Sequence, residues 1–188
     1  MRREHHEKKK KGTKKQELSD LMIPYQEWHS QLQSLYDSQI FHNWALCQDV
    51  HLNDEKDGLL LRLIPTRQLQ KNTERIENKL LNHIELYLTY SKVYNEPLLL
   101  LRIWEEKSID GIPMTKLMLP TDIESLLDVQ GKFQLGLDTI INLEGSVWYS
   151  FHPCDTSCIV GDQAEFMSTY LRRWVSIFIF SWLGYEDS

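Results

Sequence analysis

The densest group of chemically reactive residues in the sequence is the segment 152–158, His-Pro-Cys-Asp-Thr-Ser-Cys. Near neutral pH a thiolate is a far better nucleophile than a hydroxyl, and it needs only modest activation. His152 stands two positions before Cys154, and Pro153 stiffens the link between them, so the imidazole stays close to the thiol. The segment therefore indicates a nucleophilic thiol at Cys154.

Three other interpretations of this segment stay open from the residues alone. His152, Cys154 and Cys158 would give a metal three ligands, but zinc prefers four, and no second Cys or His pair lies nearby in the sequence. Cys154 and Cys158 would form a redox pair, but their spacing of four differs from that of Cys-x-x-Cys oxidoreductases. The third interpretation is a loop whose thiols and histidine only pack. We expect neither a bound metal nor a cofactor.

A thiol that carries an acyl group makes fewer demands on the fold than a protease nucleophile does. A cysteine protease needs a distant histidine and an orienting residue. The candidate histidines stand in no recognisable context for that role: His29, His42, His51 and His83. A thioester carrier needs an exposed thiol, an apolar surface beside it that excludes water, and hydrogen-bond donors for the developing oxyanion. Asp155 beside the thiol is expected to raise its pKa, which suits a carrier that must avoid stray acylation.

The segment must be positioned by a strand before it and a helix after it. Residues 147–151, Val-Trp-Tyr-Ser-Phe, predict a short strand that leads directly into His152. Asp162, with Glu165 three positions later, predicts the start of a helix over 164–183. The longest apolar run lies in this helix and covers about ten residues, whereas a membrane span needs roughly twenty. We therefore expect a buried helix and no stable membrane insertion.

Upstream of this site the sequence predicts a helix and then a block of strands. Apolar spacing predicts one helix over 24–36 and, more weakly, another over 67–82. Apolar runs and alternation predict strands at 44–52, 59–64, 84–94, 98–104 and 114–119. The Thr-Asp-Ile-Glu sequence at 121–124 is a capping box for a helix to 129. This order predicts an α+β domain, a mainly antiparallel sheet flanked by helices.

Composition describes one ordinary globular domain. The 188 residues are 41% hydrophobic and 26% charged, which excludes a disordered chain and a coiled coil. Eight basic and four acidic residues lie within positions 1–20, so the rest of the chain carries a net charge of −10. An acidic body argues against nucleic-acid binding and suits docking onto basic protein surfaces. Three cysteines form no disulfide framework, so we expect a reducing, cytoplasmic compartment.

The basic stretch at the start of the chain is set apart from this domain. Met22 opens a sequence that looks like a natural start. We therefore expect residues 1–21 to be a basic tail, disordered or added as a leader, and residues 22–188 to form a single domain.

Three stretches together resemble one protein family. They are Phe-His-Pro-Cys-Asp-Thr at 151–156, Gly-Ser-Val-Trp-Tyr at 145–149 and the Tyr-Asn-Glu-Pro turn at 94–97. These stretches resemble the autophagy-related protein 10 family of ubiquitin-like-protein conjugating enzymes, and closely its fungal member. The resemblance runs from Met22 to the carboxyl terminus in the same element order. It implies the core plan of a conjugating enzyme.

The resemblance also implies a reaction with named partners. Cys154 would accept autophagy-related modifier 12 as a thioester from the activating enzyme, autophagy-related protein 7, and pass it to a lysine of autophagy-related protein 5. The enzyme would act in autophagosome formation, in the cytoplasm, with recruitment to the pre-autophagosomal structure. The alternative is a non-catalytic protein-binding scaffold with a conjugating-enzyme-like fold.

The residues that would stabilise the oxyanion also follow from the resemblance. Ordinary ubiquitin-conjugating enzymes carry a His-Pro-Asn triplet whose asparagine serves this purpose, and this chain has no such triplet. The resemblance points instead to Tyr94 and to His152, two positions before the cysteine. From the residues alone, a catalytic role and a purely structural position, in the core or at the rim, are equally compatible with Tyr94 at a turn. Cys47, between apolar neighbours, indicates a core position, and Cys158 is interpreted as a bystander.

Overall fold

An antiparallel sheet forms the centre of the protein in the computed structural model, which describes residues 23–53, 58–73, 79–127, 135–138, 147–151, 160 and 167–184. Within these residues the sheet has seven strands in the order β1-β2-β3-β4-β7-β6, with β5 paired to β4. The bounds are β1 Cys47–Asn53, β2 Gly58–Leu63, β3 Leu80–Ser91, β4 Glu96–Ile109, β5 Ile112–Leu117, β6 Leu135–Asp138 and β7 Trp148–Phe151.

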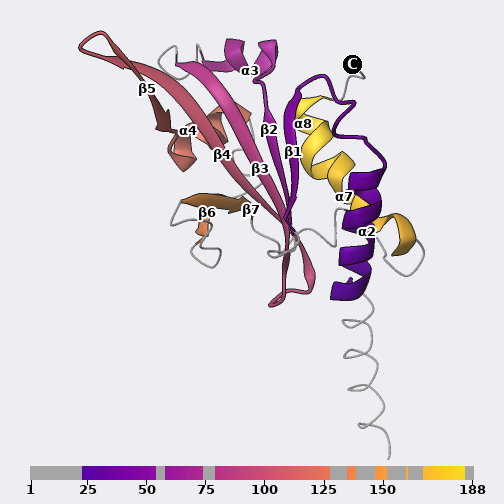
Figure 1. Cartoon of the computed structure of the whole chain (residues 1–188). Coiled ribbons are helices and arrows are strands. Elements are labelled where there is room, and N and C mark those ends of the chain that lie inside the picture. Colours follow the sequence, from indigo (N-terminus) through magenta and orange to yellow (C-terminus); the bar gives the residue numbers. More distant parts are fainter. Residues whose placement is uncertain are drawn as a thin grey trace, which may run out of the picture.

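The long strand β4 has one neighbour along its first edge and two along its second. β3 pairs with the first edge from Glu96 to Glu106. On the second edge, β7 pairs with Leu100 and Leu101, and β5 pairs with the stretch from Trp104 to Ile109. The β4–β5 hairpin therefore extends beyond the body of the sheet, at the opposite end from the turn between β3 and β4 (Figure 1).

Two helical segments far apart in the sequence lie side by side on one face of the sheet (Figure 1). The first is α2 (Tyr25–Asp37), and the second is the carboxyl-terminal run of η4 (Met167–Thr169), α7 (Tyr170–Val175), the π-helical segment η5 (Ser176–Phe180) and α8 (Ser181–Leu183). This run ends at Gly184, whose φ of 79° favours glycine. Two shorter helices, α3 (Arg67–Asn72) and α4 (Pro120–Leu127), contact each other.

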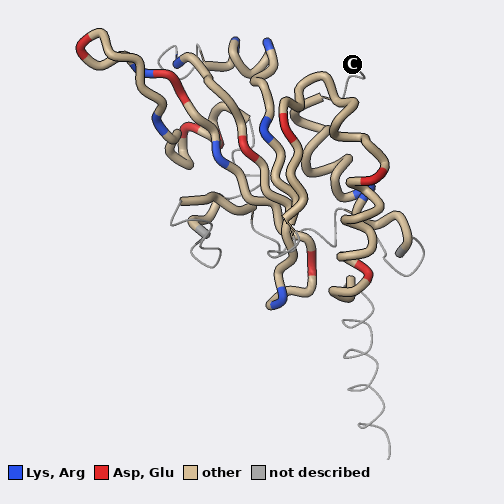
Figure 2. The backbone as a smooth tube through the Cα atoms, in the orientation of Figure 1, with Lys and Arg blue, Asp and Glu red and all other residues tan. Residues whose placement is uncertain are grey.

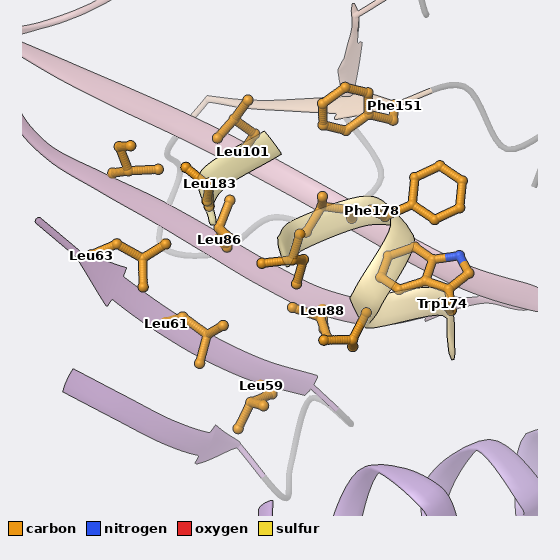
Figure 3. Packing of buried hydrophobic residues seen from close by; sticks show 14 of the residues in the cluster. Leu59, Leu61, Leu63, Leu86, Leu88, Leu101, Phe151, Trp174, Phe178 and Leu183 are labelled. Atoms are coloured by element: carbon orange, nitrogen blue, oxygen red, sulfur yellow. The ribbon is translucent and has the colours of Figure 1, made fainter. Parts of the chain in front are cut away.

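Leucines at alternate positions make the helix-covered face of the sheet into the main core (Figure 3). The strands contribute Leu59, Leu61, Leu63, Leu86, Leu88 and Leu101, and the carboxyl-terminal run covers them with Trp174, Phe178 and Leu183. The other face carries a smaller cluster of Tyr87, Leu98, Leu100 and Trp148. Gly58 lies against that cluster, and a Cβ there would sit 2.3 Å from the Tyr87 hydroxyl, so a larger residue would displace the ring.

The structure confirms the predicted α+β class and most of the predicted elements. The helix over 24–36 and the strands over 59–64 and 147–151 all appear within a residue or two of the expected positions. The long carboxyl-terminal helix is present over its described part, and its predicted capping residues at 162 and 165 lie outside the described residues. The strand over 44–52 begins three residues later than predicted, at Cys47.

Three local predictions were wrong in their bounds or in their cap. The helix over 67–82 stops at Asn72, and Leu80 already belongs to β3 because it pairs with β4. The capping box fails because the helix begins at Pro120, which suits the first helical position, and Glu124 instead accepts a bond from the backbone of β6. The strand over 84–94 ends at Ser91, so Tyr94 lies in the turn that follows it.

Candidate functional site

Tyr94 lies in the turn between β3 and β4, at the end of the sheet away from the β4–β5 hairpin (Figure 1). Its side chain is 45% exposed, so the ring does not belong to the core. Its backbone N–H donates to the Ser91 hydroxyl at 3.4 Å, and the next residue, Asn95, has a left-handed φ of 53°. Tyr94 therefore lies at a turn, as predicted, and its exposure excludes a core position.

β7 leads the chain toward the same end of the sheet. It runs antiparallel to β4, with Leu101 opposite Tyr149 and Leu100 opposite Ser150. Successive residues of β7 therefore oppose earlier residues of β4, and β4 begins at the turn that holds Tyr94. β7 ends at Phe151, immediately before His152. His152, Cys154 and Cys158 themselves lie outside the described residues.

Both described flanks of the segment 152–159 are fixed to the carboxyl-terminal helical run. Before it, Phe151 is buried and its ring lies 6.4 Å from that of Trp182. After it, Val160 is fully buried, and its carbonyl accepts a hydrogen bond from the Arg173 guanidinium. The reactive segment thus starts and ends at positions that packing holds in place.

A charge cluster on the other face of the sheet supports the beginning of β7. The guanidinium of Arg102 lies 3.9 Å from the ring centre of Trp148, and it is 2.8 Å from the Glu85 carboxylate. Glu85 also accepts hydrogen bonds from the Trp104 indole at 2.9 Å and from Arg62 at 3.1 Å. Figure 2 shows the two basic positions on β2 and β4 on either side of the acidic one on β3.

The neighbours of Glu85 determine its ionisation state. Burial opposes its charge, but the indole of Trp104, the charge of Arg102 and the hydrogen bond from Arg62 outweigh burial and hold the pKa of Glu85 below its ordinary value. The carboxylate is therefore ionised at neutral pH, and it anchors Arg102 over Trp148. Sequence reasoning missed this cluster, although a charged residue between Leu101 and Ile103 in an apolar strand was a visible signal.

Cys47, the one cysteine within the described residues, is unsuited to catalysis. It is half-buried at the start of β1 and packs against the main core, as its apolar neighbours predicted. Burial raises the pKa of its thiol from the ordinary value of 9.0 to about 11. A backbone hydrogen bond at Asp49 lowers the pKa, and the charge of the Asp49 carboxylate raises it; burial is the largest of the three effects. Little thiolate exists there near neutral pH.

Cys47 is therefore expected to react slowly with alkylating agents in the folded protein. A pKa higher by about two units lowers the thiolate fraction at pH 8, and with it the alkylation rate, roughly a hundredfold relative to a free cysteine. Timed iodoacetamide labelling followed by peptide mass spectrometry measures the rate at each cysteine. The same labelling in urea is the control, since unfolding should restore the rate of a free thiol. Labelling of Cys47 in the folded protein at the free-thiol rate would contradict the assignment.

The described residues contain no group of three His, Cys, Asp or Glu side chains that could hold a metal ion. In the same part of the chain, no helix is long and apolar enough to cross a bilayer.

Comparison with known proteins decides the family. The family model "Autophagocytosis associated protein, active-site domain" matches residues 2–186. The chain is 99% identical over 167 residues to the ubiquitin-like-conjugating enzyme ATG10 of Saccharomyces cerevisiae, which is 89% of this chain and all of that relative. The chain belongs to the autophagy-related protein 10 family. It is a ubiquitin-like-conjugating enzyme of autophagy, a transferase, and its reaction requires a ubiquitin-like protein as partner.

Solved structures of the autophagy-related protein 10 family confirm the fold. The chain covers 99% of the chain described as "Crystal structure of Autophagic E2, Atg10", with 88% of its own length, 94% identity and a TM-score of 0.72. It covers 95% of the chain described as "Solution structures of KmAtg10", with 86% of its own length and a TM-score of 0.58; at 24% identity this match shows the fold alone. The expected conjugating-enzyme-like sheet flanked by helices is confirmed.

Proposed function

We propose that Cys154 accepts autophagy-related modifier 12 as a thioester from autophagy-related protein 7 and passes it to a lysine of autophagy-related protein 5. The observation that carries the proposal is the course of β7 in a chain of this family. β7 ends three residues before Cys154 and runs toward the end of the sheet that carries the β3–β4 turn. The proposed nucleophile therefore follows a strand that leads toward the end of the sheet where Tyr94 lies. Cys47 is excluded as the acceptor by its burial and raised pKa.

Loading exchanges one thioester for another. The Cys154 thiolate attacks the carbonyl of the modifier on the cysteine of the activating enzyme. A new C–S bond forms, the old C–S bond breaks, and the activating enzyme leaves as a thiolate. Because the two thioesters have similar energies, we expect the exposure of Cys154 and docking to the activating enzyme to control this step.

Transfer places a different demand on the site. The neutral amine of the acceptor lysine attacks the thioester carbonyl, and its oxygen becomes an oxyanion. As the tetrahedral intermediate collapses, a C–N bond replaces the C–S bond, Cys154 leaves as a thiolate, and the amine releases a proton to solvent. We propose that the Tyr94 hydroxyl and the His152 side chain donate hydrogen bonds to the oxyanion, in place of the absent asparagine.

The same proposal covers where the reaction takes place. We assign the activity to the domain 22–188 and place it in the cytoplasm, with recruitment to the pre-autophagosomal structure. The three cysteines without a disulfide framework support a reducing compartment.

Replacing Cys154 tests the proposal directly. Incubated with activating enzyme, ATP and modifier, the protein is expected to form an adduct that a thiol reductant cleaves. Cys154→Ser should give an adduct that resists reductant, because an oxygen ester replaces the thioester, or no adduct at all. Denaturing gels run with and without reductant measure both outcomes.

Two matched cysteine variants control this experiment. Cys47→Ala and Cys158→Ser should both form the reductant-sensitive adduct. If Cys158→Ser abolishes the adduct and Cys154→Ser does not, the nucleophile is Cys158. If the wild-type protein forms an adduct with another ubiquitin-like protein and none with autophagy-related modifier 12, the proposed modifier is wrong.

A further inference from the structure

The hydroxyl of Tyr90 connects the turn that carries Tyr94 to the beginning of α2. It donates to the backbone carbonyl of Ile23 at 2.7 Å, and the side-chain Oδ1 of Asn95, a second acceptor, lies 3.3 Å from the same hydroxyl. A phenol has one proton to donate, so the two acceptors share it, and the contact with Ile23 is the shorter one. The two partners are far apart in the sequence, and the Tyr90 hydroxyl contacts both of them.

Aromatic packing holds the Tyr90 side chain rigidly in this position. Its ring makes an edge contact with Tyr25 at 5.5 Å between centres and a tilted contact with the fully buried Trp28 at 6.0 Å. Burial and the negative charge of Glu96 raise the pKa of Tyr90, so the hydroxyl keeps its proton near neutral pH. The hydroxyl is thus a fixed point to which the turn is attached.

The turn itself is largely exposed, and Lys92 contributes one further contact with α2, its ammonium 5.5 Å from the ring centre of Tyr25. Val93 is 74% exposed and Tyr94 is 45% exposed, and the hydrogen bond from Tyr94 to Ser91 is long at 3.4 Å. Asn95 has a φ of 53°, in the left-handed region that asparagine tolerates better than most residues. The direction in which Tyr94 leaves the sheet depends on this conformation, because Tyr94 is the residue directly before Asn95.

We propose that Tyr90 is a positioning residue for transfer of the modifier. Its hydroxyl connects the left-handed residue Asn95 to the start of α2 and thereby fixes the position of Tyr94 at the end of the sheet toward which β7 runs. The inference rests on the proposed role of Tyr94, and it adds a residue that touches neither the thioester nor the acceptor.

Tyr90→Phe tests the inference because it removes the hydroxyl and keeps the ring that packs on Tyr25 and Trp28. Preformed thioester is mixed with increasing acceptor, and single-turnover discharge is followed. The maximal rate constant is expected to fall roughly fivefold to tenfold, while thioester formation and the half-saturating acceptor concentration stay unchanged. Tyr36→Phe, at the other end of α2, where the ring contacts His42, is the matched control and should discharge at the wild-type rate.

A double-mutant cycle separates positioning from a general loss of stability. If Tyr90 acts through Tyr94, Tyr90→Phe should cause no further slowing in a Tyr94→Phe background. Asn95→Gly keeps the left-handed backbone and removes the amide, so it should slow discharge as much as Tyr90→Phe.

The possible failures are distinguishable. Full additivity of the two tyrosine variants, or wild-type discharge by Tyr90→Phe while Tyr94→Phe is slow, would overturn the inference and leave the role of Tyr94 intact. Wild-type discharge by Tyr94→Phe would overturn the role of Tyr94, and the inference with it.

Discussion

Tyr94→Phe is expected to load the modifier normally and to discharge it onto the acceptor about 10²–10³-fold more slowly. Loading exchanges two thioesters of similar energy, whereas transfer to an amine must pass through a tetrahedral oxyanion. Removing a single oxyanion donor costs about 2.7–4 kcal/mol of transition-state stabilisation. Phenylalanine keeps the ring of this half-exposed turn residue, so the change isolates the hydroxyl.

A single-turnover chase of preformed thioester measures this effect without interference from loading. Val93→Ala is a suitable control, because it alters the more exposed neighbour in the same turn and leaves the phenol in place. His152→Ala should also form the thioester and slow its discharge, if that side chain shares the role. Unchanged discharge by Tyr94→Phe would show that Tyr94 is a rim tyrosine without a part in the chemistry.

The elements that could be predicted from the sequence are those whose apolar residues recur with a clear periodicity. Leucines alternate through β2 and β3, and apolar residues recur at helical spacing through α2, so these elements were recognised, β2 and α2 with nearly the correct ends. β6 was not predicted, because its four residues, Leu135–Asp138, are too few for a pattern. It exists as a strand because it pairs with β7. Strands of this kind depend on tertiary contacts more than on local propensity.

For the candidate site too, the sequence predicted local features but not the long-range contacts. The His-Pro-Cys segment, the strand before it and Tyr94 at a turn could be identified from local sequence and family resemblance. The bond from Tyr90 to Ile23 joins residues 67 positions apart, and the contact of Arg102 with Trp148 crosses between two strands. No local pattern encodes such contacts, because the register of the sheet decides which side chains meet. The residues that support the site therefore came from the structure.

Arg102→Met is expected to lower the free energy of unfolding by about 3 kcal/mol, the lower end of the cost of removing one partner from a buried ion pair. Glu85 is nearly buried, and without Arg102 its charge keeps the half-exposed Arg62, the neighbouring His83 and the hydrogen bond from the Trp104 indole. The variant also loses the cation over the Trp148 ring at 3.9 Å. Urea unfolding at pH 7 measures the loss. Arg62→Met removes a partner of the same carboxylate that is 51% exposed, so it should cost at most about 1 kcal/mol.

The pH dependence of stability tests whether Glu85 is the cause of the Arg102 effect. The pKa of Glu85 is lowered in the folded protein, so its ion pairs stabilise the fold fully above its ordinary value of 4.5. This stability is lost as the pH falls through the lower folded pKa. The difference in free energy of unfolding between wild type and Arg102→Met should therefore be full at pH 7 and shrink in acid.

The double variant Arg102→Met/Glu85→Gln should recover part of the lost stability at pH 7, because no uncompensated charge stays buried. An equal loss at every pH, with no recovery in the double variant, would mean that Arg102 stabilises the protein through packing on Trp148 alone.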